Sequence, residues 1–271
     1  MTRRSTRLAL LGALVAALFL AAAPALAITD GQKDTTHTNV GLVRFTTADG
    51  RFRCSGTLIA PKVVLTAGHC TEGPATDVYV SFDTDLALDP LQAGITPAEK
   101  AAREARYIKG TAHPHPDWDG KLNFVKQHDM GVVVLDARAS TKWPGITPAP
   151  LPPVGLLDQN QGELKNETFT LVGYGVEIGD NKARITIPYR SFTTSYLKNV
   201  GDEVVTFQIS DTDSKAGGGS CFGDSGGPAF WGQYVLGDAS YVNSFQCNAT
   251  GSYQRVDTQA ARDFLSQFPG L

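Results

Sequence analysis

The chain has 271 residues, of which 42% are hydrophobic, and its formal net charge is −3. Because this charge is small and no basic run occurs beyond the first residues, nucleic acid and anionic membrane surfaces are not expected as partners. After an N-terminal leader, the remaining length is that of one compact unit and leaves no room for a second functional domain.

The first residues have the pattern of an export signal. Three arginines within the first seven positions precede an apolar run over 8–23, and a small-x-small cleavage site ends at Ala27. The apolar run is short for a membrane span, which favours a cleaved signal over an anchor. We therefore predict a signal peptide at 1–27 and a mature chain of residues 28–271 that is secreted and has no attachment to a membrane.

Short apolar or alternating segments separated by Gly, Pro, Asn and Asp make up most of the mature chain. Segments of this kind are typical of β-strands, and they include residues 40–45, 54–59, 78–82 and 168–174. A Pro-rich stretch at 143–153 cannot supply a central strand, because proline has no N–H to donate to a sheet. We predict an all-β fold in two halves that this stretch links.

Two segments have a helical pattern. Residues 96–106 are rich in Ala, Glu, Lys and Arg after Pro97, which predicts a short surface helix in an inserted loop. The segment 257–268 places apolar residues at positions i, i+3, i+4 and i+7, with Asp257 or Thr258 as its N-cap. It therefore predicts a second helix, with one apolar face, at the end of the chain.

Residues 221–228 read Cys-Phe-Gly-Asp-Ser-Gly-Gly-Pro, which makes Ser225 a candidate nucleophile. A serine hydroxyl is a weak nucleophile by itself, so it needs a histidine to accept its proton and a carboxylate to orient that histidine. His69, in Thr-Ala-Gly-His-Cys, and Asp129, just ahead of an apolar run, are the candidates. The chain order of the three residues is His, Asp, Ser.

This order separates folds that share the same chemistry. In α/β-hydrolases, whose Gly-x-Ser-x-Gly motif also fits here, the acid and the histidine follow the serine, but no histidine follows Ser225. The subtilisin order needs an acid ahead of His69, and nothing around Asp30 or Asp49 indicates one. The chymotrypsin order remains.

Residues 66–70 and 223–228 resemble the histidine and serine motifs of the trypsin/chymotrypsin family of serine endopeptidases, and the resemblance covers nearly the whole mature chain. It implies a secreted enzyme of bacterial type, with two antiparallel β-barrels, an active site in the cleft between them and a C-terminal helix. The expected divisions are a first barrel at about 28–142, the linker 143–153, a second barrel at about 154–256 and the helix 257–268.

The resemblance also implies a role for each candidate residue. His69 acts first as general base and then as general acid, and Asp129 holds the imidazole in the required tautomer. The backbone N–H groups of Gly223 and Ser225 form the oxyanion hole. No cofactor and no metal ion take part.

Four cysteines in an exported chain predict two disulfides, and four cysteines allow three pairings. No Cys-x-x-Cys pair is present, which argues against a zinc site. Among the three pairings, the resemblance selects Cys54 with Cys70, next to His69, and Cys221 with Cys247, next to the serine loop.

The primary substrate pocket follows from the same resemblance. Gly219 takes the place at the base of the pocket where an acid in relatives selects Lys or Arg, so cleavage after a basic residue is not expected. The walls are assigned to Ser220, Ser240, Tyr241, Val242 and Gly251. Ser240 is also expected to bind Asp129, and Val242, which replaces a glycine, narrows the entrance. We predict a preference for an uncharged P1 side chain of small to moderate size.

The new N-terminus has an expected role of its own. Ile28-Thr29-Asp30-Gly31 resembles the Ile-Val-Gly-Gly start of activated family members, whose free ammonium inserts beside the acid preceding the nucleophile. Here that acid is Asp224, and the ammonium of Ile28 would give this buried carboxylate a partner. Signal cleavage would then produce the active chain without a separate activation step.

The partners expected of such an enzyme are protein or peptide substrates, and a protein inhibitor is a further candidate. Two other interpretations stay open from the sequence: a non-catalytic homologue that keeps the scaffold to bind a protein or a surface, and an esterase on the same scaffold.

Overall fold

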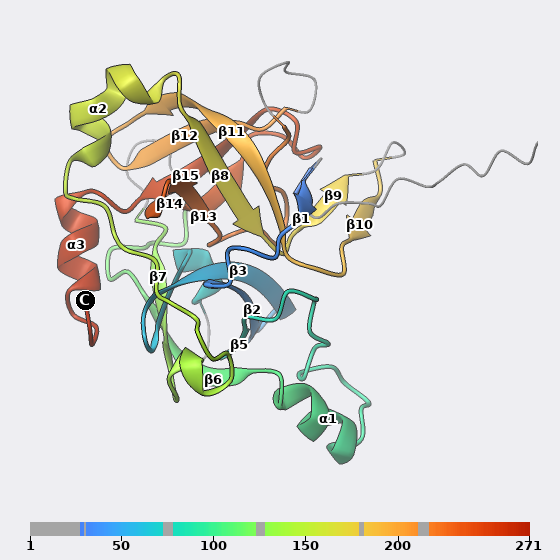
Figure 1. The fold of residues 1–271 in the computed structure, drawn as a ribbon. Coiled ribbons are helices and arrows are strands. Elements are labelled where there is room, and N and C mark those ends of the chain that lie inside the picture. Colours follow the sequence, from blue (N-terminus) through green and yellow to red (C-terminus); the bar gives the residue numbers. More distant parts are fainter. Residues whose placement is uncertain (1–27, 30, 73–77, 123–127, 179–181, 211–216) are drawn as a thin grey trace, which may run out of the picture.

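In the computed structural model, the described residues are 28–29, 31–72, 78–122, 128–178, 182–210 and 217–271. Their strands form two β-barrels that lie one above the other in Figure 1. The six antiparallel strands of the first barrel close in the order β2 (Val40–Thr47), β3 (Gly50–Ala60), β4 (Val63–Thr66), β7 (Gly131–Leu135), β6 (Ile108–Pro114) and β5 (Val78–Ser81).

The second barrel is also antiparallel, and it closes because its first and last strands pair with each other. Its order is β11 (Ser191–Val200), β12 (Val204–Gln208), β15 (Thr250–Arg255), β14 (Tyr234–Val242), β13 (Pro228–Trp231) and β8 (Thr168–Gly173), with β8 pairing again to β11. A two-residue strand β1 (Gln32–Lys33) adds to β11, and β9 (Val176–Ile178) forms a small hairpin with β10 (Arg184–Thr186). The predicted all-β fold with two barrels is confirmed.

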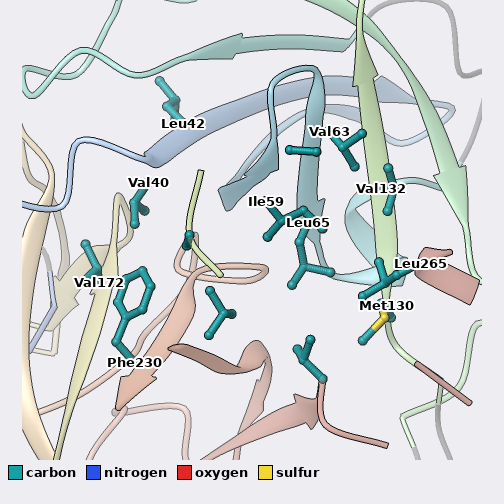
Figure 2. Close-up of a cluster of buried hydrophobic side chains, with 14 of the residues drawn as sticks. Val40, Leu42, Ile59, Val63, Leu65, Met130, Val132, Val172, Phe230 and Leu265 are labelled. Carbon is teal, nitrogen blue, oxygen red and sulfur yellow. The ribbon is translucent and has the colours of Figure 1, made fainter. Parts of the chain in front are cut away.

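The first barrel has strands that are apolar on both faces, since one face fills the barrel and the other meets the second barrel. In β4, Val64 packs inside the barrel, while Val63 and Leu65 point into a cluster shared by both barrels. Figure 2 shows this shared cluster, in which Val172 and Phe230 of the second barrel meet strands of the first. Successive side chains along such a strand therefore point into two different apolar cores, and not alternately into a core and into solvent.

The Pro-rich stretch 143–153 contains no strand and hydrogen-bonds to both barrels. The Ala149 N–H donates to the Leu58 carbonyl in the first barrel, and the Val235 N–H of the second barrel donates to the Pro150 carbonyl. The start of the chain differs from the expected division, because Ile28 and β1 lie against the second barrel instead of the first. The reason is packing: the Ile28 side chain is fully buried in the core of the second barrel.

Three α-helices lie outside the barrels among the described residues. α1 (Pro97–Glu104) begins after Thr96, which forms a capping box with Glu99, and α3 (Gln259–Leu265) begins after Thr258, whose side chain accepts from the Ala261 N–H. Apolar residues of α3 pack into the cluster between the barrels. None of the described helices is both long enough and apolar enough to cross a membrane.

The sequence did not predict α2 (Leu156–Leu164), because its cap comes from far along the chain. Gly155 stands at the N-cap position without a side chain to offer. Instead, the Leu157 N–H donates to a carboxylate oxygen of Asp257 at 2.8 Å. Asp257 also binds the buried Arg255, so the start of α2 is fastened to the end of the second barrel.

A buried ion pair on the second-barrel side holds an arginine that reaches the first barrel, away from the cleft. The Nε of Arg190 lies 2.6 Å from Asp34 Oδ2, and both side chains have no exposed surface. Arg190 also donates to the Val40 carbonyl of the first barrel. Burial by itself raises the pKa of Asp34, but hydrogen bonding by His37 and the charge of Arg190 outweigh it and hold this pKa well below its ordinary value.

We expect Asp34→Ala to lower the free energy of unfolding by about 3–5 kcal/mol, because Arg190 would stay buried without its carboxylate. The matched control is Lys33→Ala, which removes an ion pair to Asp85 whose side chains are 46% and 67% exposed and should cost less than about 1 kcal/mol. Denaturant unfolding near pH 7 compares the two variants.

The Asp34 pair should also confer a pH dependence on stability. Since its folded pKa lies below the ordinary value of 3.8, the stabilisation is present above that pH and is lost as the pH falls further. Equal losses for the two variants at neutral pH would contradict the assignment of Asp34 and Arg190 as a buried, stabilising ion pair.

Candidate active site

The three candidate residues come from both barrels and meet at their interface. His69 lies in a 3₁₀ turn (Gly68–Cys70) directly after β4, and Asp129 lies just before β7. Since β4 and β7 pair with each other, the turn and the aspartate are held side by side. Ser225 lies in the loop ahead of β13, and it lines the same cleft as His69.

Asp129 is a fully buried carboxylate that is held by groups from both barrels. Its Oδ2 lies 2.9 Å from His69 Nδ1, and its Oδ1 accepts from the His69 backbone N–H at 2.8 Å. From the second barrel, the Ser240 hydroxyl donates to Oδ2, and the side chain of Gln254 accepts from the Asp129 N–H. Because Nδ1 is committed to the carboxylate, Nε2 is left as the ring nitrogen available to the cleft.

The electrostatics of this pair favour a charged histidine next to an ionised carboxylate. Burial lowers the pKa of His69, but the hydrogen bond and charge of Asp129 and the charge of Glu72 outweigh burial and raise the pKa above 6.5. Burial raises the pKa of Asp129, but hydrogen bonds from His69 and Ser240 lower it below its usual value. Asp129 can therefore stabilise a proton on the imidazole without taking it.

The serine loop approaches the first barrel so closely that only glycines fit. Gly226 has a φ of 76°, and a Cβ on it would lie 2.1 Å from Thr66 Oγ1. The Ser225 carbonyl accepts from the Ser55 N–H at 2.8 Å, and the Ser55 hydroxyl donates to the Gly223 carbonyl. These bonds lock the loop onto β3, so the position of Ser225 depends on contacts with both barrels.

The loop leaves two N–H groups free for a ligand. Within the described part of the chain, neither the Gly223 N–H nor the Ser225 N–H donates to a protein acceptor. Gly223 adopts a φ of 96°, which favours glycine at this position. Two free donors of one loop, next to a serine hydroxyl, are the groups that an oxyanion hole requires.

Asp224 is fully buried beneath this loop. Its carboxylate accepts from the Gly175 N–H at 2.7 Å and from the Cys221 N–H at 2.8 Å. Burial raises its pKa to about 7 despite these two bonds and the charge of Arg53. In this chain Ile28 is still joined to residue 27, so it has no ammonium, and its pairing with Asp224 stays a prediction.

The segment at Ile28 and Thr29 is nevertheless built into the site. Thr29 and Gly219 exchange backbone hydrogen bonds of 3.0 and 3.2 Å, beside the buried Ile28 side chain. Gly219 is the residue expected at the base of the substrate pocket, so the N-terminal segment supports the pocket from behind.

Both cysteine pairs implied by the resemblance are bonded, Cys54 with Cys70 and Cys221 with Cys247. The first ties β3 to the turn of His69, and the second ties the serine loop to the segment before β15. The ligand atoms of Cys54, His69 and Cys70 lie within 4.8 Å of one another. Because the two sulfurs are joined as a disulfide, this group does not offer thiolates to a metal ion.

The cleft has a volume of about 670 Å³ and contains most of the predicted pocket residues. Ser220, Ser240, Tyr241 and Val242 line it, whereas Gly219 and Gly251 lie behind its wall. A Cβ on Gly219 would come within 2.1 Å of the Ile209 side chain, and a Cβ on Gly251 within 2.8 Å of Ser220 Oγ. Both glycines are therefore required by close packing.

Sequence reasoning missed several residues of the cleft. Its lining also includes Glu72, Trp118, Leu122, Phe222 and Phe245. The Trp118 indole donates to Glu72 Oε1 at 2.5 Å, which joins two loops beside His69. A tryptophan in the His-Pro-Asp-Trp-Asp-Gly segment was the available signal, since a large aromatic side chain in a polar loop points to a contact surface.

The burial of Asp238 was also not foreseen. Asp238 of β14 is fully buried, and neither of its carboxyl oxygens has a hydrogen-bond partner among the described residues. Burial, and then the charge of Asp129, raise its pKa well above the ordinary value. Burial and the charge of Asp129 thus both favour the neutral form of Asp238.

Comparison with known proteins places this fold and these motifs in one family. The model of the trypsin family matches residues 28–263. The chain therefore belongs to the trypsin family, the chymotrypsin-like serine proteases. The match covers both barrels and the start of α3.

Individual relatives are distant. The chain is 29% identical over 208 residues to chymotrypsin-like elastase family member 3B of Macaca mulatta, covering 72% of this chain and 73% of the relative. It is 27% identical over 241 residues to a chymotrypsin of Phaedon cochleariae, covering 87% and 80%. It is 26% identical over 193 residues to phenoloxidase-activating enzyme 1 of Spodoptera litura, covering 65% of this chain and only 47% of the relative. These relatives are animal proteins, so they do not support the expected bacterial type.

Solved structures show the same fold. A collagenase structure superposes with a TM-score of 0.63 at 19% identity, covering 90% of this chain and 96% of the other. Human heparin binding protein superposes with the same TM-score and identity, covering 89% and 96%. At this identity the likeness concerns the fold alone.

We expect the His69 ring to titrate above 6.5 and Asp129→Asn to lower its pKa, because the amide removes the charge that favours the imidazolium. NMR of the ring protons during a pH titration measures this without requiring activity. Asp136→Asn is the matched control, since it removes an exposed carboxylate at the other end of β7. A His69 pKa that does not respond to Asp129→Asn would refute the assigned pairing.

Proposed function

We propose that this chain is a secreted serine endopeptidase that hydrolyses peptide bonds through an acyl-enzyme intermediate. Ser225 is the nucleophile, His69 the general base and then the general acid, and Asp129 the residue that orients His69. The observation that carries the proposal is the buried Asp129 carboxylate, which binds His69 Nδ1 in the cleft that Ser225 also lines.

In the first half of the reaction, His69 Nε2 takes the proton of the Ser225 hydroxyl as its oxygen attacks the carbonyl carbon of the substrate. The carbonyl π electrons move to oxygen, and the Gly223 and Ser225 N–H groups donate to that oxyanion. Asp129 stabilises the imidazolium by its charge. The oxyanion then collapses, His69 gives its proton to the leaving amine, and an ester of Ser225 remains.

In the second half, water replaces the amine. His69 takes a proton from the water molecule while the water oxygen attacks the ester carbonyl. The N–H groups of Gly223 and Ser225 stabilise the second oxyanion. Collapse returns the proton to Ser225 and releases the carboxylic acid product. His69 must be neutral to begin each half, so its raised pKa places the acid limb of the activity profile above pH 6.5.

Several features support the proposed preference for an uncharged P1 side chain. The cleft walls at Ser220 and at 240–242 carry no charge. An acid at position 219 would collide with Ile209, so the base of the pocket cannot carry the charge that attracts Lys or Arg. The Val242 side chain, paired across the sheet with Gly251, projects where a glycine would leave the entrance open.

Location and maturation form part of the same proposal. Two disulfides fit an oxidising compartment outside the cytosol. The predicted signal peptide falls on residues 1–27, outside the described residues. A free amine at Ile28 is proposed to pair with Asp224, and the raised pKa of Asp224 indicates a carboxylate that lacks sufficient positive charge.

We expect the secreted protein to cleave an unbiased peptide mixture after uncharged residues, and Ser225→Ala to lower the rate by at least about 10⁴-fold, because the nucleophile is gone. Mass spectrometry of the products gives both the rate and the cleaved sites. Ser266→Ala, an exposed serine at the end of α3, is the control.

Three outcomes would contradict this proposal in different ways. Cleavage that persists in Ser225→Ala would exclude the assigned nucleophile. Preference for Lys or Arg at P1 would exclude the pocket assignment. No cleavage by either form, with an Ile28 terminus confirmed, would favour a non-catalytic binding homologue.

We expect Val242→Gly to raise the ratio of kcat/KM for P1 Phe over P1 Ala substrates by about tenfold, because a few methyl groups in an apolar pocket account for selectivity of that size. Val242→Ala should give an intermediate ratio. Matched peptides that differ only at P1 provide the measurement, and a ratio that stays constant across the series would show that Val242 does not limit the pocket.

A further inference from the structure

Among the described residues, no cationic side chain hydrogen-bonds to Asp224, and Ile28 has no free amine while it is joined to residue 27. Two backbone N–H groups bind its carboxylate, from Gly175 and Cys221. Among the described side chains, Arg53 is the one whose charge acts on Asp224. Keeping a buried carboxylate ionised with only two neutral donors costs free energy, so the positive charge of Arg53 contributes to stabilising the ionised form of Asp224.

Arg53 lies directly beside the serine loop. Its guanidinium donates from Nη2 to the Gly175 carbonyl at 3.3 Å, and the N–H of the same Gly175 donates to Asp224 Oδ1. A Cβ on Gly223 would lie 3.3 Å from Arg53 Nε, which places the guanidinium against the backbone of that glycine. Arg53 therefore touches both segments that surround Asp224.

The guanidinium is not used by another acid. No carboxylate in the described part of the chain lies within 4.0 Å of Arg53, whereas Arg51, two residues away on β3, pairs with Asp89 at 3.4 Å. Arg44, which faces Arg53 across the sheet, is bound to the Tyr107 hydroxyl and the Ala87 carbonyl. Burial lowers the pKa of Arg53, as expected of a cation that is partly removed from water.

We propose that Arg53 is a positioning residue that keeps Asp224, and with it the Gly223 N–H, in place while the Ile28 amine is blocked. This rests on the proposed function, because the Gly223 N–H is assigned to the oxyanion hole. Arg53 holds the loop from outside through Gly175, and the free Ile28 ammonium takes over that task after cleavage. A chain with a residue ahead of Ile28 would then retain hydrolytic activity.

Arg53 also lies beside Gly223, so a contact with the substrate on the leaving side is the competing explanation. The methyl ester of an N-acylated, uncharged amino acid distinguishes a positioning role of Arg53 from a substrate contact. Its leaving group is methanol, so it has nothing for Arg53 to contact beyond the scissile bond. A loop that is out of place slows the hydrolysis of this ester, whereas the loss of a substrate contact does not.

The experiment compares two chains, one starting at Ile28 and one with Ala27 left ahead of it. In the extended chain, Arg53→Met should lower kcat for the ester by about tenfold, a typical size for coupling between two sites. Arg53→Lys should restore part of this loss, because it keeps the charge. In the chain that starts at Ile28, Arg53→Met should cause a clearly smaller loss. Arg51→Met is the matched control on the same strand.

A second readout does not require activity. Hydrogen exchange of the amides in 221–227 should become faster in extended Arg53→Met than in extended wild type, and to a smaller extent when the chain starts at Ile28. This readout decides the inference even if the wild-type chain proves inactive, which would refute the proposed function alone.

The proposal is overturned by either of two results. Equal effects of Arg53→Met on the extended and the Ile28 chains, or no effect on either, would show that Arg53 does not substitute for the ammonium. A rise in KM that appears only with peptides extended on the leaving side would assign Arg53 to substrate contact.

Discussion

The buried carboxylate of Asp129 is the constraint around which the two barrels are arranged. A charge at an apolar interface must have its lone pairs satisfied, and here the donors come from both sides: His69 follows β4 of the first barrel, and Ser240 lies on β14 of the second. If the barrels moved apart, Asp129 would lose donors and stay partly desolvated. The geometry needed for chemistry is thus the same geometry that stabilises the interface.

Close approach at the same interface explains the glycines around Ser225. Gly226 and Gly227 lie against Thr66 and the Val172 carbonyl at distances that exclude a Cβ. Arg190 supports the interface at its other end through Asp34 and the Val40 carbonyl. With polar ties at both ends and an apolar cluster between them, one arrangement of the barrels is favoured over others (Figure 2).

The parts that could be predicted from the sequence are those with local signals. Alternation identified the strands, and Thr258 marked the start of α3. The origin of α2 could not be predicted, because Gly155 gives no cap and Asp257 supplies one from across the fold. Nor could the burial of Asp238, since its neighbours in β14 give no sign of which face will be covered. In the cleft, Trp118 and Glu72 meet only after two loops fold together.

Three buried aspartates near the cleft differ mainly in how many donors they have, and this decides which of them can carry charge. Asp129 has three donors, and its pKa is lowered. Asp224 has two, and burial raises its pKa to about 7. Asp238 has none among the described residues, and burial raises its pKa well above the ordinary value.

Of these three aspartates, Asp224 is the one whose ionisation a nearby charge can change. Asp129 is shifted towards the ionised form, because its pKa is lowered, and Asp238 is shifted towards the neutral form, because its pKa is raised. Asp224 is balanced between the two states, so one added cation at hydrogen-bond distance shifts it decisively towards the ionised form. A free amine at Ile28 is the cation proposed for this role, and the Arg53 guanidinium reaches Asp224 only indirectly, through hydrogen bonds on the two sides of Gly175. The loop that carries Ser225 is therefore sensitive to charge at Asp224.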